Sequence, residues 1–154
     1  MCRRSLLAGR WLDAIRKLNV PEQACPCGKL NPSKKPLAFA ACCARYLSDF
    51  DNYPAPDAES LMRSRYSAFV LNRNDYLKAT WHVSTCPADV SQGDATKWLG
   101  LDVRRHVVID ADHAQVEFVA RYRIAGLGAR LHELSRFVRE AGRWYYLDDD
   151  LSYK

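Results

Sequence analysis

The spacing of apolar residues predicts helices in the middle of the chain. From Asp57 to residue 71, apolar residues recur at steps of three and four, as in a helix with one buried side. Asp57 and Glu59 place negative charge in the first turn of this segment, where it favours a helix start. Asn74 can accept hydrogen bonds from free backbone amides, so it predicts the cap of a second helix. We therefore expect one helix over residues 57–71 and a shorter one after Asn74.

After a loop with Pro87 and Gly93, apolar and polar residues alternate, which is typical of half-buried strands. One face of the first two strands is predicted to carry Leu99, Leu101, Val103, Val107 and Ile109, then Val116, Phe118, Ala120, Tyr122 and Ile124. A third strand is expected over residues 129–139, and a fourth over residues 144–147. Helices followed by a meander of antiparallel strands predict an α+β fold.

Residues 1–20 are interpreted as an N-terminal extension, and residues 5–18 within it show the apolar spacing of a short helix. Arg3 and Arg4 resemble the start of a twin-arginine export signal, but charged residues interrupt the apolar run that such a signal needs. No segment approaches the ~20 apolar residues that span a bilayer. We therefore expect no membrane insertion and a cytoplasmic location, where reducing conditions favour metal binding over disulfides.

The composition fits an ordinary globular domain with a small appendage. The 154 residues are 48% hydrophobic and 27% charged, which argues against a disordered chain. The formal net charge is +5, and a zinc ion held by four thiolates would lower it by about two units. This mild basicity permits an acidic partner such as RNA, but it falls short of the clustered positive face of most nucleic-acid-binding proteins.

Two close pairs of cysteines are the strongest chemical signal. Cys25 and Cys27 are separated by one residue, and Cys42 and Cys43 are adjacent. A redox dithiol usually has two residues between its cysteines, and an oxidised pair of neighbours would be strained. Four thiolates instead complete the tetrahedral shell of a structural zinc ion and leave no position for a catalytic water. The sequence therefore predicts that Cys25, Cys27, Cys42 and Cys43 bind Zn²⁺ in a small knob over residues 21–50.

Six short segments carry a further signal. They are Leu61–Val70, Asp75–Leu77, Thr80–His82, Val116–Tyr122, Ser135–Arg139 and Gly142–Tyr146. These segments resemble the YchJ-like family of bacterial proteins. The resemblance implies a SEC-C zinc motif at 21–50, followed at 55–152 by a nuclear-transport-factor-2-like (NTF2-like) cone of helices on a bent antiparallel sheet. The fourteen residues from Gly28 to Ala41 form a longer loop than is usual in the family, which costs little extra entropy and is compatible with metal binding.

A cone of this kind can hold a ligand if polar side chains point into it. The polar residues of the predicted helices and strands that could face into the cone are Arg63, Arg65, Tyr66, His82, Glu117, Arg121, Arg123, His132, Glu133 and Arg136. From these, His82, Arg121 and Glu133 are the candidates for anion contacts or acid–base chemistry. The same residues could instead form a solvent-exposed outer face. Paired carboxylates, a nucleophile beside a histidine and a glycine-rich phosphate loop do not stand out.

The sequence favours a zinc-binding protein that acts as a non-catalytic interaction or ligand-binding module. The alternative is an enzyme or small-anion binder that uses the cone cavity. Similarity to the motif of the SecA translocase implies a protein or ribosome partner, met through basic residues of the knob: Lys29, Lys34, Lys35 and Arg45. RNA binding would need exposed aromatic and basic residues together, and core packing explains the aromatic run of residues 144–146 better.

Overall fold

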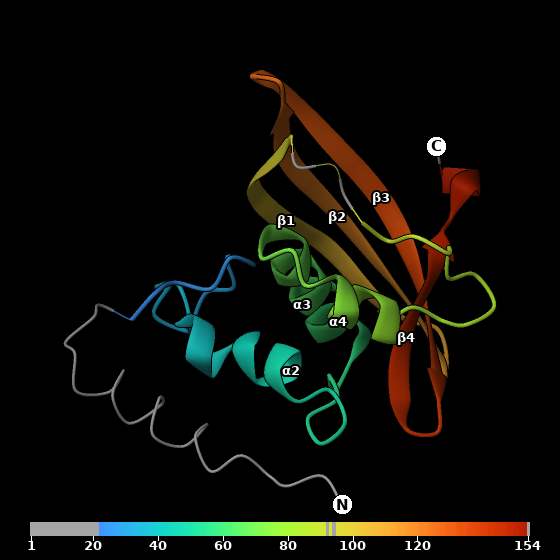
Figure 1. The fold of residues 1–154 in the computed structure, drawn as a ribbon. Coiled ribbons are helices and arrows are strands. Elements are labelled where there is room, and N and C mark those ends of the chain that lie inside the picture. The colour runs from blue at the N-terminus through green and yellow to red at the C-terminus, as the bar shows by residue number, and fades with distance from the viewer. Residues whose placement is uncertain (1–21, 92, 94, 154) are drawn as a thin grey trace, which may run out of the picture.

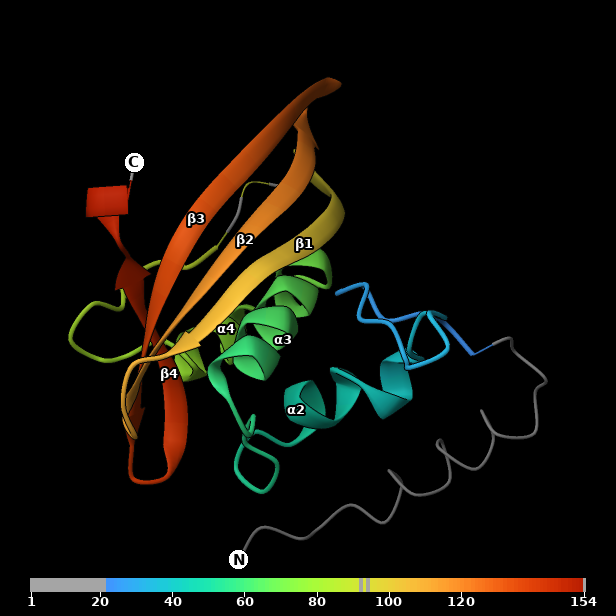
Figure 2. The same cartoon turned by 180° about the vertical axis from the view of Figure 1, so that it is seen from behind.

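The computed structural model describes residues 22–91, 93 and 95–153. Its main feature is a curved four-stranded antiparallel sheet with the order β1-β2-β3-β4. The strands are β1 (Thr96–Val108), β2 (His113–Ile124), β3 (Leu127–Glu140) and β4 (Arg143–Asp149). The helices α3 (Ala58–Val70) and α4 (Asn74–Ala79) lie against one face of the sheet, as Figures 1 and 2 show from opposite sides. This arrangement confirms the predicted α+β class.

The N-terminal part of the described chain contains only short elements. They are the 3₁₀ helix η1 (Phe39–Ala41) and helix α2 (Ala44–Ser48), and a second 3₁₀ helix, η2 (Leu151–Tyr153), follows β4. The helix expected at residues 5–18 lies outside the described residues. None of the helices in the described part of the chain is long and apolar enough to cross a membrane.

Helix α3 begins where the charge pattern predicted it. Asp57 caps it, because its side chain accepts a 2.7 Å hydrogen bond from the amide of Ser60, and Glu59 follows in the first turn. The expected cap of α4 was wrong: Asn74 is the first helical residue, and Arg73 stands at the cap position without a capping side-chain bond. The Arg73 side chain instead bridges Asp75 and the carbonyl of Leu47, which ties α4 to α2.

Alternation predicted the face of β2 well and the face of β1 in part, since Leu101 and Val103 pack against the core as expected. Val116, Phe118 and Ala120 of β2 are all buried in the core and Tyr122 lines a cavity, whereas Ile124 at the end of the strand was expected inside and is 47% exposed. In β1, irregularities between Trp98 and Gly100 and between Val103 and Arg105 shift the register against β2. Such bulges move following side chains to the other face, so Leu99 is 45% exposed while Trp98 packs against the core. Ile109, which was expected inside, lies beyond the end of β1 and is 57% exposed.

The long cysteine loop folds back on itself. The amide of Cys25 donates to the carbonyl of Leu37, and the amide of Leu37 donates to the carbonyl of Lys29, each at 2.8 Å. At the tip, the Asn31 side chain accepts the amide of Lys35, and Lys34 adopts a positive φ of 60°. The extra residues therefore form a closed hairpin, and they leave the cysteine pairs free to approach each other.

Candidate metal centre and ligand cavity

The four predicted metal ligands meet in one buried cluster. Their sulfur atoms all lie within 4.8 Å of one another. The Cys27 Sγ and Cys42 Sγ atoms are 3.6 Å apart, and those of Cys42 and Cys43 are 3.9 Å apart. A zinc ion with Zn–S bonds of about 2.3 Å in a tetrahedral shell requires sulfurs about 3.8 Å apart. The cluster is therefore consistent with a metal site and already has nearly the required spacing.

Local backbone structure explains how each pair presents its thiols. The amide of Gly28 donates to the carbonyl of Cys25 at 3.0 Å, and Gly28 has a φ of 68°, so the first pair lies on a tight turn. The second pair lies at the junction of η1 and α2. Cys42 ends the 3₁₀ helix, and the carbonyl of Cys43 accepts the amides of the first turn of α2.

The electrostatics of the cluster favour a cation. Burial and the neighbouring thiols raise the pKa of Cys42 to about 12. The pKa of Cys43 is also raised, mainly by its hydrogen bond with the Cys25 thiol, whereas hydrogen bonds from its neighbours lower the pKa of Cys25. The buried cluster thus stabilises one thiolate and resists further negative charge. A bound divalent ion would remove this resistance, since it deprotonates coordinating thiols.

The metal cluster is joined directly to α3. The Arg63 side chain donates to the carbonyl of Cys27 at 3.2 Å and pairs with Glu59 one turn earlier. The Cys25 Sγ atom lies 3.7 Å from the hydroxyl oxygen of Ser67. All four cysteines belong to the same buried cluster as the core residues of α3. The knob and the cone therefore share one hydrophobic core.

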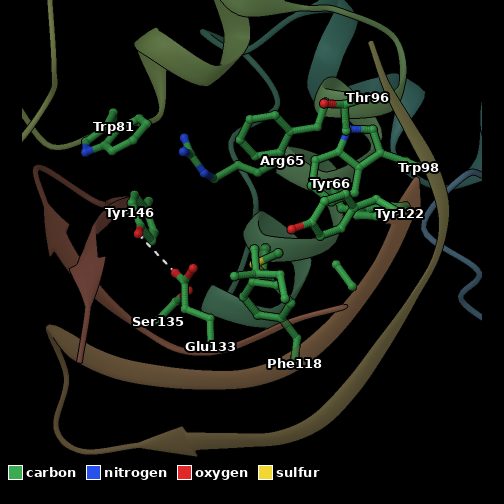
Figure 3. A pocket seen from close by; sticks show the side chains of 14 residues that line it. Arg65, Tyr66, Trp81, Thr96, Trp98, Phe118, Tyr122, Glu133, Ser135 and Tyr146 are labelled. Atoms are coloured by element: carbon green, nitrogen blue, oxygen red, sulfur yellow. Dashed lines mark hydrogen bonds between the residues drawn. The ribbon is translucent and has the colours of Figure 1, made fainter. Parts of the chain in front are cut away.

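The second site is a cavity of about 340 Å³ between α3, the sheet and the segment after α4. Its aromatic lining consists of Tyr66, Phe69, Trp81, Trp98, Phe118, Tyr122 and Tyr146. Its polar lining consists of Arg65, Thr96, Glu133 and Ser135. Figure 3 shows these side chains converging from the helix, the sheet and the segment at Trp81. Aromatic walls with a few polar groups are typical of small-molecule sites.

Arg65 is the most unusual residue of this cavity, because its side chain is charged and only 3% of the residue is exposed. Its Nη1 atom donates to the carbonyl of Leu77 and to Oγ1 of Thr80, both at 2.8 Å. The guanidinium carbon lies 5.0 Å from the ring centre of Trp81 and 4.7 Å from that of Tyr146 (Figure 3). Burial lowers the pKa of Arg65 to about 10, which still leaves it charged near neutral pH.

Glu133 lies at another part of the cavity wall. Its Oε1 atom accepts hydrogen bonds from the hydroxyl of Ser135 at 2.7 Å and from the hydroxyl of Tyr146 at 3.1 Å (Figure 3). Burial, followed by the charge of Glu133, raises the pKa of Tyr146. Tyr146 therefore stays protonated; its ring contacts the guanidinium of Arg65 and its hydroxyl contacts Glu133, whose charge offsets part of the effect of burial on the pKa of Arg65.

The structure does not bring the three candidate cavity residues together. Glu133 lines the cavity, but Arg121 is exposed on the outer face of β2, beside Gly100 of β1. His82 lies outside the lining, where its Nε2 atom is 2.9 Å from Glu140. The wider set divides in the same way. Arg123, His132 and Arg136 are exposed, and Glu117 pairs with Arg105 and His132 on the outer face, whereas Arg65 and Tyr66 line the cavity.

His82 has a neighbour that the sequence reasoning missed. Its Nδ1 atom is 2.6 Å from the hydroxyl of Ser84 and also accepts the Ser84 amide at 3.3 Å. The other ring nitrogen contacts Glu140, so the hydroxyl of Ser84, the imidazole of His82 and the carboxylate of Glu140 form one hydrogen-bonded row. Ser84 is exposed, and these three residues line none of the described cavities, so the geometry supports a surface hydrogen-bond cluster that fixes the turn after Trp81.

The chain combines a curved sheet packed on α3, a cavity between them and a cluster of four cysteines near its N-terminus. These features place it among the α+β proteins with an NTF2-like fold, here with an N-terminal cysteine motif. The family model described as the middle NTF2-like domain of YchJ matches residues 57–149. The chain belongs to this YchJ-like family, whose curated members are named UPF0225 proteins.

Individual relatives agree with this assignment. A UPF0225 protein of Polaromonas sp. strain JS666 is 63% identical over 132 residues, which cover 85% of this chain and 95% of the relative. A UPF0225 protein of Bordetella parapertussis is 54% identical, with 83% of this chain and 92% of the relative covered. The crystal structure of a SEC-C motif containing protein from Psychrobacter arcticus is similar, with 36% identity and a TM-score of 0.68, covering 82% of this chain and 81% of that one.

Proposed function

We propose that this protein is a zinc-stabilised, non-catalytic binding module whose cavity takes up a small organic ligand. The observation that carries the proposal is the buried, charged Arg65 in a cavity with seven aromatic side chains. A buried guanidinium is costly to desolvate, and a ligand that contacts it would offset that cost. The proposal assumes a reducing compartment such as the cytoplasm, where thiols remain available to a metal.

Zinc is the proposed occupant of the cysteine cluster. Four thiolates at these separations suit a single tetrahedral ion, and a complete shell of protein ligands is typical of structural zinc. The basic residues Lys29, Arg45 and Arg63 line a small hollow beside the cluster and offset the negative charge of a zinc–thiolate centre. Zinc bound here would stabilise the knob against α3 and would take no part in a reaction.

The cavity supports binding better than catalysis. Its described lining contains neither histidine nor cysteine, and Arg65 is too basic to exchange a proton near neutral pH. Glu133 already accepts hydrogen bonds from two hydroxyl groups. The alternative, an enzyme or anion-binding site, would depend on Glu133 as the base or Arg65 as the anion contact.

Two measurements test the proposal on protein purified without added metal. Elemental analysis should find about one zinc per chain, lost in Cys42→Ser and retained in the matched control Cys86→Ser, since Cys86 lies outside the cluster. Native mass spectrometry and thermal-shift screening should detect a small ligand that the cavity-filling change Leu131→Trp excludes. Zinc-free folded protein would refute the metal part, and ligand binding unaffected by Leu131→Trp would refute the cavity part.

A second candidate role is docking of the knob on an acidic protein or ribosomal surface. The hairpin tip supports it, because Lys34 and Lys35 are exposed there and the neighbouring Leu30 is 52% exposed. Such binding should weaken as salt rises. Affinity capture with the zinc-loaded chain should recover partners that are lost in Lys34→Glu/Lys35→Glu and kept in Lys78→Glu, a charge change on α4. Identical partners with both variants would refute this role.

A further inference from the structure

We propose that the ligand of the cavity is a two-ring aromatic carboxylate whose acid group binds Arg65. The inference rests on the proposed function, because it names the ligand class of the same cavity. Cavity size, aromatic lining and the contacts of Arg65 each support one part of it.

The size of the cavity sets the scale of the ligand. An apolar cavity of about 150 Å³ is known to accept one benzene molecule. This cavity, at about 340 Å³, has roughly twice that volume. It therefore suits a ligand with about two aromatic rings and excludes most larger cofactors.

The walls favour flat, unsaturated ligands. Trp98 contacts the rings of Tyr66 and Tyr122 with centroid distances of 5.7 and 5.4 Å, so these three side chains form a continuous aromatic wall. Trp81 and Tyr146 pack edge to face on the opposite side of the cavity, 5.0 Å apart. Rings at such distances offer both faces and edges to a planar ligand, and each stacked or edge contact adds to simple burial.

Arg65 supplies the preference for an acid. Its hydrogen bonds within the described chain all use Nη1 and go to two neutral oxygens, from Leu77 and Thr80. Arginine has five N–H donors in a flat fork, so Nε and Nη2 remain for a ligand. The ion pairs of the described residues do not include Arg65. Glu133 of the same lining offsets part of this charge through space, and a planar carboxylate on the cavity side of Arg65 matches the fork geometry of the donors that remain.

A purely structural role is the competing explanation for Arg65. Through Leu77 and Thr80 the guanidinium ties α3 to the end of α4, and this tie would exist with an empty cavity as well. The two explanations differ in one respect. A structural tie predicts no preference between an acid and its neutral isostere, whereas a ligand contact predicts a large one.

Protein-detected NMR with matched probes separates these explanations. The ¹⁵N-labelled, zinc-loaded full chain is titrated with 2-naphthoate and with 2-naphthamide, which has the same rings and no charge. The indole signals of Trp81 and Trp98 report on the cavity, and Trp144, which is buried outside its lining, serves as the internal reference. We expect 2-naphthoate to bind at least about 10-fold more tightly than the amide, which corresponds to ~1.4 kcal/mol.

Variants confirm that the preference comes from Arg65. Arg65→Met should abolish the 10-fold preference, and Arg121→Met, on the outer face, should leave it unchanged. If Arg65→Met does not fold, Leu131→Trp is used instead and should abolish binding of both probes. Equal binding of acid and amide by the unaltered protein would overturn the ligand class and leave the binding module intact. Failure of both probes to shift Trp81 and Trp98 would overturn the ligand class and count against the cavity function as well.

Discussion

Thr80 offers the sharpest test of how the buried Arg65 is held. Thr80 is fully buried, its Oγ1 atom accepts from Nη1 of Arg65 at 2.8 Å, and its hydroxyl donates to the carbonyl of Tyr76 at 2.8 Å. Thr80→Val keeps the shape of the side chain and removes the oxygen. Nη1 of Arg65 would then retain only the carbonyl of Leu77 as an acceptor.

The expected cost follows from the charge of the donor. A hydrogen bond to a charged group contributes about 1.5–3 kcal/mol, more than a neutral one. Only 3% of Arg65 is exposed and Thr80 is fully buried, so bulk water has little access to the position of the lost acceptor. Each kcal/mol shifts the melting temperature of a chain of this size by roughly 2–4 °C, so we expect a fall of roughly 3–12 °C. Thr80→Ser, which keeps the hydroxyl and loses one methyl group, should cost only about 1 kcal/mol.

Urea unfolding at saturating zinc gives the free energies for both variants. A double-mutant cycle with Arg65→Met isolates the contact, since Thr80→Val should cost much less once the guanidinium is absent. The reasoning is refuted if Thr80→Val costs no more than Thr80→Ser, or if the two changes are additive.

Three further predictions concern the metal, the outer face and the alkaline limit. Cys42→Ser should lose zinc and make the melting temperature insensitive to a chelator, as seen by calorimetry with and without chelator; a persistent chelator effect would contradict the metal assignment. Arg130 lies directly opposite Arg121 in the register of β2 and β3, so two positive charges face each other. Arg130→Glu should therefore raise the free energy of unfolding by about 0.2–1 kcal/mol in low salt and by less in high salt. Destabilisation in low salt would contradict this. Burial raises the pKa of Tyr76 from 10.0 to about 12 in the folded protein. As the pH rises, the unfolded chain therefore loses this proton first, and the free energy of unfolding should fall as the pH rises from 10.0 to about 12. Tyr76→Phe should flatten that fall in urea titrations at alkaline pH, and an unchanged slope would contradict the assignment.

Local signals in the sequence were sufficient for most of the fold. The cap at Asp57 and the spacing after it predicted α3, and strict alternation predicted the buried face of β2, because each depends on neighbours along the chain. The bulges of β1 depend on its partner strand instead. Nothing in the spacing around Trp98 and Leu99 shows which of the two faces the core, so the predicted face of β1 was partly wrong.

The metal cluster and the cavity differed in how much the sequence could reveal. Cysteine spacing is specific, and all four sulfurs meet as predicted. The lining of the cavity depends on which polar residues lie on the inner face of the sheet. Odd and even positions of β3 have similar compositions, so the sequence does not show which of them face the cavity. Leu131, Glu133 and Ser135 of β3 line the cavity, whereas His132 and Leu134 lie on the other face of the sheet, where His132 is exposed and Leu134 is buried. Arg65 follows Leu61 by one helical turn, on the buried side of α3, and this position was the signal that could have selected it.

Helix α3 connects the two sites, so a metal at the cluster would influence a ligand in the cavity through this helix. Arg63 and Ser67 contact the cysteine turn, while Met62, Arg65 and Tyr66 on the same helix form the cavity wall. A metal that holds the cysteine turn in place thus restrains the helix that carries the ligand contacts. Because binding energies are linked through a shared element, a ligand that requires this position of α3 must in turn increase the affinity of the cluster for its metal. The cysteine turn and the cavity wall therefore share one helix, and under the proposed function zinc and ligand should each strengthen the binding of the other.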